Sequence, residues 1–395
     1  MKKSLYIFIL VLFTTKFFSL HPFGDIFTAL GGIPWFLTVF IWMSYGALIY
    51  KSKAHHDLFV KKNILPVIWI FVGILLSFIP AYIYSGQSPL VSFSTYRYQY
   101  FWVVLFLIIY IKPLPNDIIK SLSCFSILFV TAALAKHYLV SDWFYITEVE
   151  GDKQSRYIDD ILYPDGLSLL LIPFYYYCSK IRQSSTVRDL IIILLFFFSF
   201  LILHNRSTLL IAVLIVAFSI LTKKSKYRIP FIVLSLGIGI LIVYYTQDVW
   251  IDIYEETMSQ IDNDDYARIV AINYFLSDGN PNWVTTIFGN GFLSAHVNSI
   301  SYDLAERGIY NSDVGFIGYW NYYGIIPIIV FIIYIFKSFF SKRCPFYVKA
   351  IGFHMLCCSL TISYFAKPEG ILWFSFFYYL YIYHNNKQPL YEVKR

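Results

Sequence analysis

Long apolar runs separated by short polar segments make up most of this chain. Twelve runs approach the roughly 20 residues that a helix needs to cross the hydrocarbon core of a bilayer. They cover residues 5–20, 27–50, 64–85, 98–111, 121–140, 162–178, 190–204, 208–222, 229–246, 314–336, 350–366 and 370–384. The pattern predicts an all-α polytopic membrane protein with about 12 transmembrane helices.

Two polar segments are longer than a connection between helices requires. Residues 141–161 form the smaller segment, and residues 247–312 form the larger one, between the ninth and tenth predicted spans. The chain therefore divides into residues 1–246 with nine spans, the polar insertion 247–312, and residues 313–395 with three spans and a tail. We expect the site residues mainly in the insertion, because a long loop on a rigid scaffold usually carries function.

The composition excludes a water-soluble globule. Hydrophobic residues make up 58% of the chain, charged residues only 14%, and the mean hydropathy is +0.61. Such a chain has too little polar surface to stay dispersed in water. We expect the first apolar run to be retained as a span, because Lys16 interrupts it and no small-x-small cleavage site precedes His21.

The charged residues orient the predicted bundle. With the N-terminus inside, the inner segments hold 22 of the 31 Lys and Arg residues and only four of the 24 Asp and Glu residues. Cytoplasmic loops of membrane proteins collect Lys and Arg. We therefore predict that both termini are cytoplasmic and that the insertion lies on the exported side of the membrane. The net charge of +7 reflects this topology, and it does not indicate nucleic-acid binding.

No pattern in the chain predicts a metal, a nucleotide or a disulfide. All five cysteines fall in predicted spans or on the inner side, and the histidines lack zinc-ligand spacing. A phosphate-binding Gly-rich loop with its Lys is missing, as is a catalytic Ser elbow. We therefore expect an activity without a cofactor.

Within the insertion, an amphipathic helix and a tight turn are predicted. Ile269, Ile272, Phe275 and Leu276 recur at helical spacing, and Gly279, Asn280 and Pro281 end the pattern. This helix is expected to lie on the outer membrane face. Gly289 and Gly291 then permit a tight turn before the chain reaches Asp313 at the next span.

Arginines on the exported side are the clearest candidates for ligand binding. Basic residues are rare there, yet Arg97, Arg156, Arg206, Arg268 and Arg307 all face outward in this topology. A guanidinium binds phosphate or pyrophosphate oxygens through two parallel hydrogen bonds and keeps its charge. The pattern favours a lipid-linked pyrophosphate ligand, with Arg206 held in a short turn between two spans.

Structural explanations compete with this interpretation. Arg268 follows Asp264 by four residues and could form an ion pair with it. Arg97 lies among tyrosines, as an interfacial anchor does, and Arg206 could contact lipid phosphate without specificity. Arg307, next to Glu306, fits a solvated charge. His296, the one histidine of the insertion, could accept a proton near neutral pH, but a single loop histidine is more often solvated.

The region from residue 205 to 326 resembles the Wzy-type O-antigen and capsule polymerases, which share a superfamily with the O-antigen ligases. The resemblance lies in Asn205-Arg206-Ser207-Thr208, the long exported loop with Arg268, Phe288-Gly289-Asn290-Gly291, Ser312-Asp313-Val314-Gly315-Phe316-Ile317-Gly318 and Tyr323-Gly324-Ile325. Arg268 and Gly279 also enclose ten residues, as in an arginine-to-glycine pattern of such polymerases, whereas Arg156 and Gly166 enclose nine.

The resemblance implies a metal-independent glycosyl transfer at the outer face of the membrane. The donor would be a growing glycan on undecaprenyl pyrophosphate, and the acceptor a lipid-linked repeat unit. Arg206 and Arg268 would stabilise the departing pyrophosphate, with His296 as the candidate base. Arg97, Arg156, Gly289, Gly291 and Asp313 would bind substrate. Membrane lipids, a flippase and a chain-length regulator of the same pathway are the implied partners.

Three other functions remain open on the sequence. An O-antigen ligase would share the donor and the site, but Val297 separates His296 from Asn298 where ligases present an adjacent His-Asn pair. A transporter, such as a flippase of lipid-linked sugars, is supported by Lys16, Lys136 and His137 near or inside spans. However, transporters commonly show repeated halves, which this chain lacks. A structural scaffold would not need arginines beside span ends.

Overall fold

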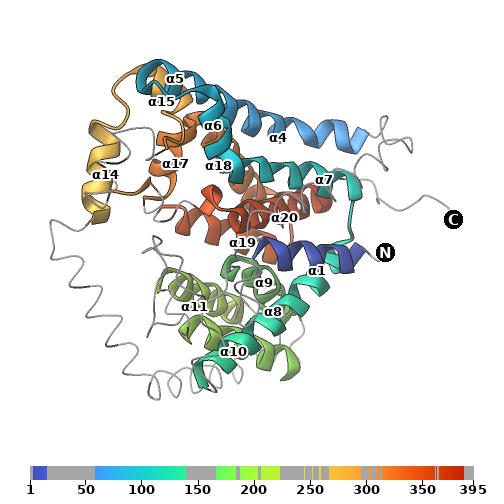
Figure 1. Cartoon of the computed structure of the whole chain (residues 1–395). Helices are drawn as coiled ribbons and strands as arrows, with labels where there is room; N and C mark the ends of the chain where they lie inside the picture. Colours follow the sequence, from blue (N-terminus) through green and yellow to red (C-terminus); the bar gives the residue numbers. More distant parts are fainter. Residues whose placement is uncertain are drawn as a thin grey trace. The chain divides into compact units, whose positions relative to one another are not determined.

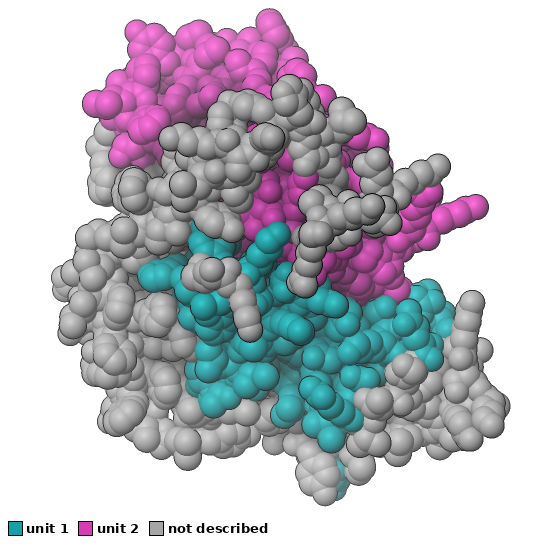
Figure 2. Space-filling model, turned by 90° about the vertical axis from the view of Figure 1, so that its right-hand side faces the viewer, with its two compact units in different colours: residues 1–36, 116–263 teal, residues 37–115, 264–395 magenta. Residues whose placement is uncertain are grey.

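A computed structural model describes residues 3–15, 58–138, 166–183, 187–202, 206–222, 267–294, 309–311, 314–360 and 364–386, with a few single positions between these ranges. The regular structure in these ranges is entirely helical, as predicted (Figure 1). The chain forms two compact units, which Figure 2 colours separately. Met1–Phe36 and Asn116–Asn263 belong to the first unit, and Leu37–Pro115 and Asp264–Arg395 to the second.

The first unit is built around a helix of mostly buried residues. Its described helices are α1 (Lys3–Thr14), α8 (Pro115–Tyr138, all but its first residue), α9 (Leu167–Gln183), α10 (Val187–Ile202) and α11 (Arg206–Leu221). Helix α9 packs against both α10 and α11. Phe174 of α9 contacts Phe196 and Phe200 of α10, with the ring centroids 6.0 and 5.2 Å apart. The Ser121 hydroxyl of α8 donates to the Ser4 carbonyl of α1 at 2.5 Å.

The second unit surrounds α20, whose residues from Gly370 to Ile382 are all buried. A helix that is apolar on every side must be enclosed by other helices or by lipid. The described helices of this unit are α4 (Leu58–Leu76), α5 (Phe78–Ser85), α6 (Pro89–Thr95), η3 (Tyr96–Trp102), α7 (Val103–Ile111), α14 (Ala267–Ser277), α15 (Trp283–Phe288), α17 (Gly315–Tyr323), α18 (Ile325–Phe340), α19 (Phe346–Cys358), η6 (Tyr364–Ala366) and α20 (Pro368–Asn385). Helices α7, α19, η3 and η6 all contact α20.

A cluster of aromatic rings fills the core of the second unit. Phe331 of α18 stacks on Phe365 with the centroids 4.1 Å apart and on Trp102 at 5.4 Å. Phe374 of α20 meets Phe331 edge to face at 4.9 Å. Because aromatic pairs in these geometries add to the free energy of burial, the cluster ties η3, α18 and α20 together.

Several predicted spans prove to be two helical pieces. Span 314–336 is divided at Gly324 into α17 and α18, and span 98–111 begins as the 3-10 helix η3 before α7. Span 350–366 consists of α19, which ends at Cys358, and the separate turn η6. One described stretch, Lys62–Ser85, has the length and apolar composition to cross a membrane, a property that core helices of soluble proteins also show. Spans 27–50 and 229–246 lie essentially outside the described residues.

Polar segments of the second unit gather at two ends. At the first, which we call the basic end, the Tyr378 and Tyr379 hydroxyls donate to the Asn63 and Pro113 carbonyls, and Ser341 donates to Asn385. This end joins the start of α4, the ends of α7, α18 and α20, and residues 337–349. These are the segments that the charge pattern assigns to one side of the membrane.

The opposite end, which we call the carboxamide end, collects residues 77–99, 279–294, 311, 314–324 and 364–367. Gln99 donates to the Ala366 carbonyl at 3.2 Å, and Gln87 donates to the Phe292 carbonyl at 3.1 Å. Helices α5 and α15 lie side by side here (Figure 1). The described part of the polar insertion, chiefly residues 267–294, therefore packs at the end opposite to the basic segments.

Candidate functional site

Helix α14 presents Arg268 at the carboxamide end. The predicted helix is confirmed as Ala267–Ser277, and Ala271 and Phe275 are buried in a cluster with Ile309 and Val314. The predicted apolar face is only partly the buried one, because Ile269 and Leu276 are exposed. Arg268 precedes Ala271 by three residues and Phe275 by seven, so it lies on the same face of the helix. Its side chain is half-buried. The guanidinium is therefore held at the edge of a packed cluster.

The turn at Gly289 and Gly291 lies against the end of α17. Both residues have positive φ angles, 81° and 80°, a conformation that glycine adopts without steric cost. The Asn290 amide donates to the Asn321 carbonyl at 2.6 Å, and the Gly291 amide donates to the Tyr322 carbonyl at 3.0 Å. A Cβ atom on Gly289 would lie 2.4 Å from the Tyr322 oxygen. Glycine is required here by close packing of two backbone segments.

Carboxamide side chains join three segments around this turn. Asn321 donates to the Gly279 carbonyl at 2.8 Å, and Asn290 donates to the same carbonyl. Asn311 donates to Asn321 Oδ1 at 2.8 Å, and Asn290 donates to Asn280 Oδ1 at 3.1 Å. A carboxamide offers two N–H donors and one acceptor oxygen, which suits it to such branching. The end of α14, the turn and α17 are thus connected without any charged group.

The chain beyond the turn is fixed to residues 74–96 by a relay of hydrogen bonds. The Phe292 amide donates to the Tyr96 hydroxyl at 2.8 Å, which lies 2.6 Å from the Ser77 hydroxyl, and Ser77 donates to the Ile74 carbonyl. Because Ser77 already donates to Ile74, it accepts from Tyr96. Burial raises the pKa of Tyr96, so its hydroxyl keeps the proton that this relay requires. Gln87 adds a second bond, to the Phe292 carbonyl.

The predicted site residues divide between the two units. Arg268, Gly289 and Gly291 belong to the second unit, where the carboxamide network connects the helix of Arg268 with the glycine turn. Arg206 is the first residue of α11 in the first unit, and its side chain lies outside the described part.

The other predicted residues lie partly or wholly outside the described part of the chain. Arg97 lies in η3, next to Tyr96, and its side chain is also outside the described part. Arg156, His296 and Asp313 lie outside the described residues, as does Arg307. The structure therefore places Arg268, Gly289 and Gly291 in the second unit, with Arg268 at the start of α14 and the glycines linked to the other end of that helix. It gives no geometry for a base.

Sequence reasoning missed the neutral polar residues that organise this end. Gln87, Gln99, Asn311 and Asn321 are buried, and neither charge nor residue spacing marks them in the sequence. Gln99 accepts from Trp102 Nε1 at 3.1 Å and from the Tyr319 hydroxyl at 3.3 Å. A carboxamide within or beside an apolar run is the signal that could have found them, because such a group must find partners once buried.

Comparison with known proteins adds no assignment: no family model matches the chain, and no curated protein sequence matches it. Among the described residues, no group of three or more His, Cys, Asp or Glu side chains is arranged to hold a metal ion.

Proposed function

We propose that this chain is a polytopic glycosyltransferase of the bacterial cytoplasmic membrane that polymerises lipid-linked glycan repeat units. In this proposal the chain has about 12 membrane-spanning helices, both termini are cytoplasmic, and residues 247–312 lie at the outer face. A flippase and a chain-length regulator of the same pathway are its expected partners.

One observation carries the proposal. The Phe288–Gly291 segment forms two backbone hydrogen bonds with Asn321 and Tyr322. This places Gly289 against Gly324, whose nitrogen would lie 2.5 Å from a Cβ on Gly289. The segments of both glycines are among those in which the chain resembles the polymerases. The Gly279 carbonyl accepts hydrogen bonds from the side chains of Asn290 and Asn321. Gly279 ends the arginine-to-glycine interval that begins with Arg268. Motif pieces up to 45 residues apart in the chain thus share one rigid substructure, as a precise binding site requires.

The proposed topology is supported by the separation of the two ends of the second unit. Segments rich in Lys and Arg meet at the basic end, and the insertion packs at the carboxamide end, as expected if the unit crosses a bilayer between them. Reporter fusions after Lys394 and near Asn280 test this arrangement. We expect a cytoplasmic reading at Lys394 and an exported reading near Asn280. A cytoplasmic reading near Asn280 would contradict the proposed site.

The proposed reaction moves the growing glycan from its lipid carrier to a new repeat unit. A hydroxyl oxygen of the acceptor sugar bonds to the anomeric carbon of the donor glycan, and the bond from that carbon to the pyrophosphate oxygen breaks. The electron pair leaves with the pyrophosphate, and the acceptor proton passes to a base, for which His296 is the candidate. Arg206 and Arg268 stabilise the negative charge that develops on the leaving group.

Substitutions of Arg268 in a deletion strain test this chemistry. We expect Arg268→Ala to lower the polymerisation rate by about 10²- to 10³-fold, the usual effect of removing a charge-stabilising donor. Arg268→Lys should restore only part of the rate, because an ammonium cannot form the paired hydrogen bonds of a guanidinium. Ile269→Ala, an exposed neighbour on the same helix, is the matched control. The length of the glycan chains is read on gels. The protein level and the melting temperature of the detergent-extracted protein are measured in parallel.

The glycan left in the deletion strain distinguishes the reaction classes. A missing polymerase should leave acceptors that carry a single repeat unit. A missing ligase should leave polymer on the lipid carrier and none on the acceptor, and a missing flippase should trap repeat units on the inner leaflet. Either of the last two results would replace the proposed function. In the same strain, His296→Ala should cost about 10²- to 10⁴-fold in rate if this histidine is the base.

A further inference from the structure

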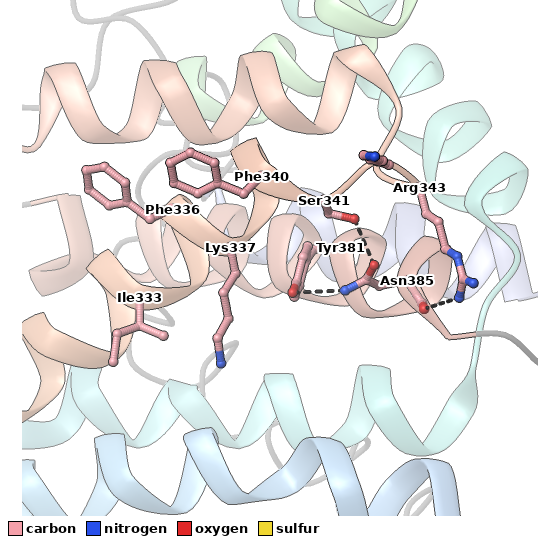
Figure 3. A pocket seen from close by; sticks show the side chains of 9 residues that line it. Ile333, Phe336, Lys337, Phe340, Ser341, Arg343, Tyr381 and Asn385 are labelled. Atoms are coloured by element: carbon pink, nitrogen blue, oxygen red, sulfur yellow. Dashed lines mark hydrogen bonds between the residues drawn. The ribbon is translucent and has the colours of Figure 1, made fainter.

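The basic end of the second unit contains an open pocket of about 680 Å³ between the ends of α18 and α20. In Figure 3, Phe336 and Phe340 lie side by side, whereas Ile333 and Lys337 extend in another direction. Ile333, Phe336 and Phe340 of α18 form an apolar part, and Lys337, Lys342 and Arg343 supply cations. The pocket lies at the end opposite to the carboxamide network, and the proposed glycan transfer uses none of its residues.

The polar floor of the pocket is rigid. Ser341 donates to Asn385 Oδ1 at 2.7 Å, and Asn385 Nδ2 donates to the Tyr381 hydroxyl at 3.0 Å (Figure 3). Arg343 Nη1 donates to the Asn385 carbonyl at 3.3 Å. A guanidinium has five N–H donors, so this bond orients Arg343 while leaving donors for a ligand. The turn after α18 is thereby fixed on the end of α20.

The cations are close in the chain and exposed. Lys337, Lys342 and Arg343 are all exposed, and no acidic side chain is among the described residues that line the pocket. Three positive charges around one pocket favour an anion, and the fork of Arg343 suits phosphate oxygens in particular.

An apolar stripe leads from the cations along α18. Ile329, Ile333, Phe336 and Phe340 follow one another at helical spacing and are 46, 42, 43 and 81% exposed. Four large apolar side chains in a row would be unfavourable in water, and they fit a surface that faces acyl chains. Lys337, which follows Phe336 in the chain, extends its ammonium over the Tyr334 ring at 4.9 Å.

We propose that this pocket binds one anionic phospholipid of the inner leaflet. The phosphate lies among Lys337, Lys342 and Arg343, and an acyl chain follows the stripe from Phe340 toward Ile329. A soluble phosphate would use the cations alone and leave the stripe unexplained. The inference rests on the membrane location in the proposed function, and it is independent of the polymerase activity.

Lipid binding by the full-length chain tests the proposal. The chain is purified in a neutral detergent, and binding of phosphatidylglycerol is compared with that of phosphatidylcholine with the same acyl chains, by native mass spectrometry. We expect a clear preference for phosphatidylglycerol. The triple variant K337Q, K342Q and R343Q should weaken phosphatidylglycerol binding by about 10²-fold, since each cation near an anionic headgroup contributes a few-fold. Equal binding of the two lipids would overturn the proposal.

A matched control removes three cations of the first unit, K180Q, R182Q and R188Q, which are also predicted to lie on the inner side. This control variant should bind phosphatidylglycerol with an affinity within about two-fold of that of the unaltered chain. An equal loss of affinity in both triple variants would show general charge attraction and would overturn the proposed site. If the triple variant of the pocket unfolds, the single variant Lys342→Gln replaces it, because Lys342 is exposed. We expect its affinity for phosphatidylglycerol to fall a few-fold.

The apolar half of the site has its own test. Phe340→Ala with Phe336→Ala should weaken binding of long-chain phosphatidylglycerol and leave binding of a six-carbon analogue unchanged. Competition by millimolar inorganic phosphate as effective as that by the lipid would establish a soluble-anion site and overturn the lipid assignment. If lipid binding follows these expectations while Arg268→Ala retains full polymer length, the proposed reaction fails and the lipid site stands.

Discussion

At the carboxamide end of the second unit, neutral polar side chains form hydrogen bonds with other parts of the chain. At the basic end, by contrast, cationic side chains are exposed to solvent around an open pocket. Asn321 reaches both Gly279 and Asn311, while Lys342 and Arg343 extend from the surface. The first arrangement produces order, because buried carboxamides cost free energy unless they are paired. The second leaves charge for a partner outside the chain. The proposed reaction belongs to the first end and the proposed lipid site to the second.

The glycine turn should be the most sensitive point of this comparison. Gly289→Ala combines a positive φ with a collision against the Tyr322 carbonyl, so we expect a loss well above the roughly 1–3 kcal/mol of backbone strain alone. Gly86 has a φ of 66° and no atom within 4 Å of its missing Cβ, which makes it the matched control. Gly86→Ala should cost about 1–2 kcal/mol. Thermal unfolding in detergent measures both, and equal losses would show that the turn is not tightly packed.

A smaller loss is expected from the carboxamide network. Asn321→Ala removes a donor to the Gly279 carbonyl and the acceptor of Asn311 in a buried setting. Each polar group left unpaired there costs about 1–3 kcal/mol. Asn385→Ala also removes two side-chain hydrogen bonds, but at a partly exposed position where water replaces them. Melting temperatures should therefore fall further for Asn321→Ala. The reverse order would remove the distinction between the two ends.

The smallest effect is expected at the cations themselves. In lipid-free detergent, Lys342→Gln should change the free energy of unfolding by less than about 0.5 kcal/mol, because exposed surface substitutions seldom do more. Added phosphatidylglycerol should raise the melting temperature of the unaltered chain more than that of the variant, because a ligand stabilises the state that binds it. A large destabilisation without lipid would instead assign Lys342 a structural role within the chain.

Much of the helical architecture could be predicted from local pattern. The apolar runs predict helices in every described segment where they occur, and the spacing of Ile269, Ile272 and Phe275 predicts α14. The interruption of span 314–336 could not be predicted in this way, because the run holds no charged residue on either side of Gly324. A Cβ at Gly324 would lie 2.0 Å from the Ile287 carbonyl oxygen, so the break depends on a segment 37 residues away in the chain.

The candidate site shows the same division. An arginine on the predicted exported side, where basic residues are rare, and two glycines that permit a turn are visible in the sequence, and these features indicate Arg268, Gly289 and Gly291. Hydrogen-bond partners were not visible, because Tyr96 and Phe292, or Gln87 and Ser294, are joined across about 200 residues. Which carbonyl accepts from which amide depends on how distant segments approach one another, and no local pattern contains that information.

By itself, the sequence determined the helical class, the position of α14, the glycine turn and the grouping of basic segments, because periodicity, backbone freedom and charge are properties of neighbouring residues. Only the tertiary structure decided that Gly279, Asn290 and Asn321 meet at one end and that the cations at the end of α18 border an apolar stripe and a pocket. Those outcomes follow from close packing between helices, where a hydrogen bond or an exposed face exists only once all of the neighbours are in position.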